Sequence, residues 1–122
     1  NFMLAAELDF AFAGARPVYT LDHPINAKHG RVPQLALWQR DEKALRGLGL
    51  RPLLLVVEPT TRRERERAAW LASLCHRVAH IEPAGALELY AGRKRFLFFE
   101  ATTVTDGAAA SAEGACPGAE IR

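Results

Sequence analysis

The strongest constraint on the fold is an uninterrupted apolar run, Leu53 to Val57, which directly follows Arg51 and Pro52. The run shows no alternation between apolar and polar side chains, and this is typical of a strand that is covered on both faces. We therefore expect residues 53–57 to form the central strand of an α/β sheet.

Helical and strand-like patterns alternate on either side of this run. Helices are predicted over residues 2–12 and 41–46 and from Thr61 up to Val78, and strands over residues 18–21, 53–57 and 78–81, followed by a hairpin of residues 86–90 and 95–103. This order predicts a three-layer α/β fold, in which a mostly parallel sheet has helices on both faces and a C-terminal antiparallel hairpin at its edge.

Local signals place the ends of these helices. Gly14 follows the first helix, where a helix stop is expected, and Asp41 is the predicted N-cap of the second. Thr61 and Glu64 have the spacing of a capping box, which predicts that the third helix begins at Thr61.

The length of 122 residues is enough for one domain and too short for two. We expect a single α/β domain over residues 1–105. Residues 106–122 are small, polar and rich in glycine, which predicts a flexible tail.

We expect Cys75 and Cys116 to be free thiols, with a disulfide as the alternative in an oxidising compartment.

Several classes of function are excluded by what the chain lacks. Its longest apolar runs are far below the roughly 20 residues that span a bilayer. The formal net charge is only +2 and no dense basic block occurs, so no nucleic-acid partner is expected. Neither a dinucleotide fingerprint nor a P-loop is present, and we predict no cofactor. His76 and His80 are four apart but lack a third ligand, so no metal site is predicted.

The most informative segment is the loop of residues 22–33 with its exit. It leaves the carboxyl end of the first predicted strand, where open α/β sheets bind ligands. Its cationic and aromatic side chains suit a phosphate or a sugar. The predicted substrate-binding residues are His23, Lys28, His29, Arg31, Gln34 and Trp38, and Asp22 and Asn26 belong to the same stretch. The alternative is an ordinary polar surface loop, with Trp38 in the core.

Three motifs carry a resemblance to a known family. They are Asn1-Phe2-x-x-Ala5-x-Glu7-Leu8-x-Phe10, then Pro17-Val18-Tyr19, then Arg31-x-x-Gln34-x-x-x-Trp38. In order and spacing they resemble the region after the last membrane helices of bacterial lipid-linked-sugar glycosyltransferases. These are the dolichyl-phosphate-mannose mannosyltransferase-like proteins, which include the lipid A aminoarabinose transferases. The likeness covers about residues 1 to 100, and it departs from the family pattern at Ala11, where a tyrosine or proline is usual.

The resemblance implies a polytopic membrane enzyme that transfers a sugar from a polyprenyl-phosphate donor. This chain would be its soluble C-terminal domain on the periplasmic face of the bacterial inner membrane, without activity when isolated. The partners implied are the membrane-embedded portion of the same polypeptide and the lipid-linked sugar phosphate. The catalytic acidic residues of such enzymes lie in the membrane portion, so no catalytic residue is predicted here. The loop of residues 22–31 is expected to face the membrane module.

A second function class remains open, a non-catalytic protein-interaction or scaffold domain. It would use the charged helix surface of residues 62–67 or the edge of the hairpin. Arg93, Lys94 and Arg95 guard that edge and discourage the addition of a further strand. A free-standing small α/β enzyme has no motif to support it.

Overall fold

The computed structural model describes residues 1–104, and the chain divides into two compact units. Unit 1 runs from Asn1 to Leu48 and unit 2 begins at Gly49. The prediction of a single domain over residues 1–105 stays a prediction, and the predicted tail of residues 106–122 lies outside the described residues.

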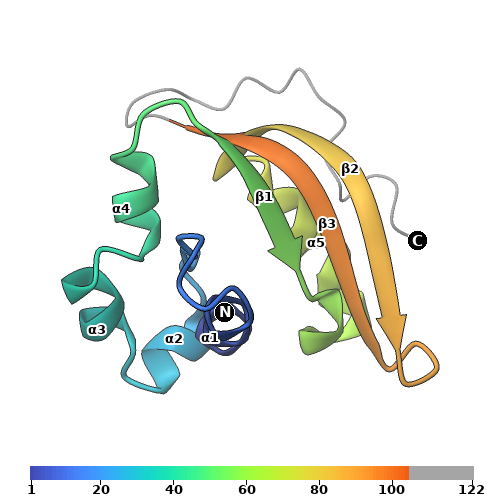
Figure 1. The fold of residues 1–122 in the computed structure, drawn as a ribbon. Coiled ribbons are helices and arrows are strands. Elements are labelled where there is room, and N and C mark those ends of the chain that lie inside the picture. Colours follow the sequence, from blue (N-terminus) through green and yellow to red (C-terminus); the bar gives the residue numbers. More distant parts are fainter. Residues whose placement is uncertain (105–122) are drawn as a thin grey trace. The chain divides into compact units, whose positions relative to one another are not determined.

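Unit 1 is built from short helices. They are α1 (Phe2–Ala11), α2 (Pro24–Lys28), α3 (Val32–Leu37) and α4 (Glu42–Arg46), shown in blue to green in Figure 1. The predicted first helix is confirmed, and Asn1 caps it by accepting a hydrogen bond from the Leu4 N–H at 3.1 Å. The predicted N-cap of α4 is also confirmed, because Asp41 Oδ1 accepts from the Ala44 N–H at 2.9 Å. Capping side chains therefore set the starts of both helices.

The strand predicted over residues 18–21 is wrong. These residues are extended but belong to no sheet. The Thr20 N–H instead donates to the Arg40 carbonyl at 2.7 Å, and the Arg40 guanidinium lies 5.3 Å from the centre of the Tyr19 ring. The Tyr19 ring and the Thr20 backbone thus contact Arg40 in the linker before α4, which offers no strand to pair with.

Unit 2 consists of β1 (Pro52–Val57), the 3₁₀ turn η1 (Pro59–Thr61), α5 (Glu64–Leu74), β2 (Val78–Leu89) and β3 (Lys94–Thr103). The strands form one sheet in the order β1-β3-β2, and both pairs are antiparallel. The predicted three-layer, mostly parallel sheet with helices on both faces is therefore wrong. The physical reason is the connection through α5, which sets β1 and β2 in the same direction but leaves one strand position between them. The β2–β3 hairpin fills that position with a strand of opposite direction.

The core of unit 2 lies where α5 covers one face of the sheet, as Figure 1 shows. Leu71 and Leu74 of α5 are 0% and 2% exposed, and they are buried together with the sheet residues Leu55, Val57, Leu97, Phe99 and Ala101. Leu54, which precedes Leu55 in β1, is 57% exposed. The run of residues 53–57 is therefore an edge strand with one buried row, and the prediction of a central strand covered on both faces is wrong.

Two local features of unit 2 also differ from expectation. The helix α5 begins at Glu64 with Arg63 as its N-cap and no side-chain cap, so the predicted capping box is wrong. Thr61 Oγ1 donates instead to the Glu58 carbonyl at 2.8 Å, closing the 3₁₀ turn η1 before the helix. The predicted hairpin is present, but its first strand is continuous with the short strand expected at residues 78–81, through irregularities near Glu82 and Gly85.

Candidate functional site

The predicted binding loop folds into α2 and is held by a buried amide. Pro24 occupies the first turn of α2, and His23 Nδ1 caps the helix by accepting from the Ile25 N–H at 3.1 Å. Asn26 is only 3% exposed. Its Oδ1 accepts from the Phe2 N–H at 2.9 Å and its Nδ2 donates to the Leu21 carbonyl at 3.2 Å. The loop is thereby fixed to the first residue of α1.

Two of the predicted residues contact the ring of Phe2, and a third contacts one of these two. The His29 ring lies 5.7 Å from it at an interplanar angle of 55°. The Arg31 guanidinium stands 5.5 Å from the ring centre, within cation–π range. Arg31 Nη1 also donates to Gln34 Oε1 at 3.1 Å. We call Phe2, His29, Arg31 and Gln34 the Phe2 cluster.

A separate surface hollow of about 390 Å³ lies beside the loop. Its lining residues are Asp22, His23, Pro24, Asn26, Ala27, Val32, Leu35 and Asp41. Among the predicted site residues, His23 alone contributes to this lining. Asp22 and Asp41 belong to this lining, and carboxylates repel phosphate oxygens at short range. The hollow therefore does not supply the cationic phosphate site that the sequence predicts.

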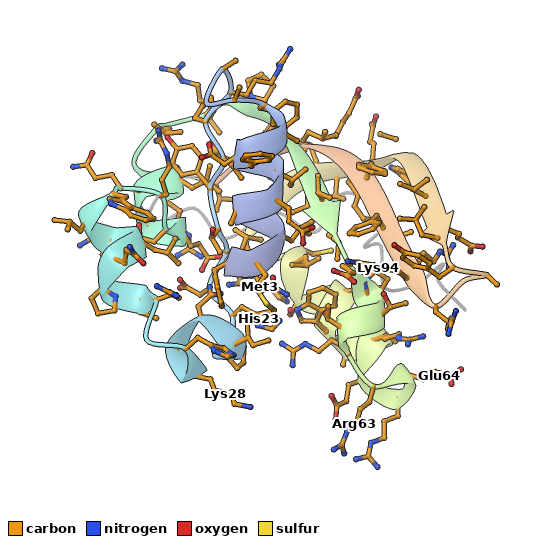
Figure 2. The ribbon with its side chains drawn as sticks, turned by 60° about the horizontal axis from the view of Figure 1, so that its bottom comes forward. Met3, His23, Lys28, Arg63, Glu64 and Lys94 are labelled. Atoms are coloured by element: carbon orange, nitrogen blue, oxygen red, sulfur yellow. The ribbon has the colours of Figure 1, made fainter. Side chains whose placement is uncertain are left out.

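The two remaining predicted residues lie apart from both features. Lys28 is the last residue of α2, where it is exposed and projects away from His23 (Figure 2). Trp38 is the C-cap of α3 and is 59% exposed, so its ring does not fill a core. The structure thus separates the predicted set into His23 at the hollow, three members of the Phe2 cluster, and two exposed side chains.

The Phe2 cluster offers binding contacts. His29 and Arg31 are both exposed, so a ligand can reach them. A guanidinium that is already oriented by a ring and an amide presents its remaining N–H groups in a fixed fork, which suits phosphate or carboxylate oxygens. In residues 1–104, no group of three or more His, Cys, Asp or Glu side chains could hold a metal ion.

Phe2 and Asn26 hold this region together, and neither was among the predicted binding residues. Phe2 belongs to the first predicted helix, whose apolar periodicity predicts a buried face and no binding residue. Its contact with a loop more than twenty residues away carries no local signal. Asn26 lies inside the predicted loop, and only its burial distinguishes it from the polar residues around it.

No protein-family model, curated protein or solved structure matches the chain. Within residues 1–104, each helix falls short of the length and apolar character needed to cross a bilayer.

Cys75, which follows the last residue of α5, is disulfide-bonded, so the expectation of a free thiol is wrong at this position. Cys116 lies outside the described residues.

Proposed function

We propose that this chain is the extracytoplasmic C-terminal domain of a bacterial membrane glycosyltransferase that takes its sugar from a polyprenyl-phosphate donor. In this proposal the membrane portion of the same polypeptide carries out the transfer. The domain supplies no catalytic group, and the Phe2 cluster helps to hold the donor phosphate or the acceptor.

One observation carries this proposal. Phe2, Arg31 and Gln34 belong to the motifs on which the family resemblance rests, and Phe2 begins α1 whereas Arg31 and Gln34 lie at the start of α3. They nevertheless form one contact cluster, through the Arg31 stack on Phe2 and its hydrogen bond to Gln34. If the likeness were a chance match of degenerate motifs, there would be no reason for the matching positions to be in contact. A binding surface shared with the family would explain why these positions are in contact.

The chemistry of the cluster supports the same proposal. Arg31 is always charged, and a guanidinium binds phosphate through two parallel hydrogen bonds. The disulfide at Cys75 supports a location on the periplasmic side, because disulfides persist in oxidising compartments.

The test uses the full-length enzyme and measures sugar transfer at varied donor concentration. We expect Arg31→Ala to raise the KM for the donor about tenfold or more, since a hydrogen bond to a charged group contributes roughly 1.5–3 kcal/mol. Arg31→Lys keeps the charge but loses the fork, so we expect it to restore only part of the affinity. Lys43→Ala removes an exposed cation from α4 and serves as the matched control.

Unchanged donor KM and transfer rate in Arg31→Ala would contradict a role in substrate handling. If the same variant instead lowered the amount of assembled enzyme, a non-catalytic scaffold domain would be favoured. The coding frame upstream of Asn1 gives an independent check, because the proposal expects it to encode several membrane spans.

A further inference from the structure

The β2–β3 hairpin continues past the end of its neighbouring strand. The last residue of β1, Val57, pairs with Leu97. Beyond this point the paired residues are Leu87 with Phe96, Glu88 with Arg95, and Leu89 with Lys94. The Arg95 N–H donates to Thr60 Oγ1 at 3.2 Å, so η1 and not a strand meets this stretch of β3. The hairpin turn and the start of α5 lie at the same end of the sheet (Figure 1). We call residues 58–67 and 87–95 the hairpin end.

Large apolar side chains are exposed at the hairpin end. Leu87 is 45% exposed and Leu89 is 38% exposed. They lie two residues apart on one strand and therefore on the same face. Tyr90 follows at the turn and is 68% exposed. Adjacent exposed apolar side chains form the kind of patch through which proteins contact a membrane or another partner.

Positive charge gathers at the same end. Its cations are Arg62, Arg63, Arg65, Arg67, Arg93, Lys94 and Arg95, and its carboxylates are Glu58, Glu64, Glu66 and Glu88. The seven cations against four carboxylates give +3, whereas the whole chain carries +2, so the rest of the chain is slightly negative. Arg95 Nε lies 3.5 Å from Glu88 Oε1. Arg63 and Glu64 project outward from the start of α5 (Figure 2).

We infer that the hairpin end is a contact surface for an anionic lipid bilayer. Cations near such a surface are attracted to its negative headgroups. Tyrosine is enriched at the membrane interface because its ring is apolar and its hydroxyl is polar. Leu87 and Leu89 lie with Lys94 on the face of the hairpin that is turned away from α5, and they add apolar area that can enter the boundary with the acyl chains. Binding to single-stranded nucleic acid is less well matched, because it uses several aromatic stacking platforms and this end has one exposed aromatic ring.

This inference goes beyond the proposed function and does not depend on it, because it rests on exposure and charge in unit 2 alone. The test is flotation of the 122-residue chain with vesicles of phosphatidylcholine alone and with vesicles of phosphatidylcholine and phosphatidylglycerol in equal parts. We expect binding to the anionic vesicles only, and weaker binding at high salt.

Two sets of variants separate the contributions. The pair Arg93→Gln and Lys94→Gln is expected to weaken binding about twenty-five-fold, at roughly fivefold for each cation removed. The set Leu87→Thr, Leu89→Thr and Tyr90→Asn removes the exposed apolar area, and we expect a loss of roughly tenfold. Threonine suits a strand, and asparagine tolerates the positive φ of 54° at Tyr90.

Matched controls remove the same chemistry elsewhere. Lys43→Gln with Arg51→Gln deletes two exposed cations outside the hairpin end, and Leu54→Thr deletes an exposed apolar side chain of β1. Both controls are expected to bind as the original chain does. Circular dichroism of every variant verifies that it is folded.

Absence of binding to anionic vesicles would overturn the inference. Equal losses in the control variants would also overturn it, since attraction would then follow total charge and not this end. A third overturning result is displacement from the vesicles by polyuridylate RNA together with indifference to the three apolar substitutions, which would assign the surface to nucleic acid.

Discussion

The Asn26 side chain joins two segments of unit 1 that are far apart in the sequence, the start of α1 and the entry to α2. Asn26→Ala removes both hydrogen bonds and leaves the Phe2 N–H and the Leu21 carbonyl without this partner. We expect the free energy of unfolding to fall by about 2 kcal/mol, measured by urea denaturation. Lys28→Ala, at an exposed position of the same helix, should change it by less than about 0.5 kcal/mol. Similar values for the two variants would contradict a structural role for the amide.

Thr103 has the corresponding role in unit 2. It is 1% exposed, its Oγ1 accepts from the Arg51 N–H at 2.9 Å, and the same hydroxyl donates to the Gly49 carbonyl. Thr103→Val keeps the shape and removes both bonds, so we expect a loss of roughly 1–3 kcal/mol in the free energy of unfolding. Thr102 is only half-buried, and its hydroxyl donates to the Ala79 carbonyl at 3.4 Å. A loss no larger than that of Thr102→Val would argue against this assignment.

Among the elements, β1 gives the sharpest comparison between adjacent positions. Leu55 is 7% exposed and Leu54 is 57% exposed. We expect Leu55→Ala to lower the free energy of unfolding by about 2–5 kcal/mol, because it leaves a cavity under α5. Leu54→Ala should cost less than about 1 kcal/mol, since much of its side chain already contacts water. Equal losses in chemical denaturation would mean that both faces of β1 are covered.

Some of these elements follow from local signals and others do not. Asn1 and Asp41 cap their helices through their own side chains, so the starts of α1 and α4 could be predicted from nearby residues alone. The start of α5 could not be predicted in this way. Thr61 has a second partner available, the Glu58 carbonyl, and the 3₁₀ turn that this bond closes delays the helix. An apolar run such as residues 53–57 has the same appearance in an edge strand and in a central one.

In the molecule as a whole, burial is unequal between the two units. Among residues 1–104, Leu45 is the one buried apolar side chain of unit 1, whereas β1, α5, β2 and β3 all contribute to the core of unit 2. Segments with few buried apolar contacts open locally at low free energy. We therefore expect amide hydrogen exchange, followed by mass spectrometry, to be at least about tenfold faster in α1–α4 than in β3. Equal protection in α1 and β3 would contradict this expectation.

Properties set by neighbours along the chain were determined by the sequence of this protein. They include the caps of α1 and α4, the β2–β3 hairpin, and the loop of residues 22–31 as a polar segment. Contacts over long separations were decided only by the tertiary structure. It placed β3 between β1 and β2, left residues 18–21 without a strand partner, and brought Arg31 onto Phe2. The physical reason is that a backbone segment becomes part of a sheet only when another strand presents its N–H and C=O groups to it. The spacing of residues along the segment does not indicate which strand that partner is.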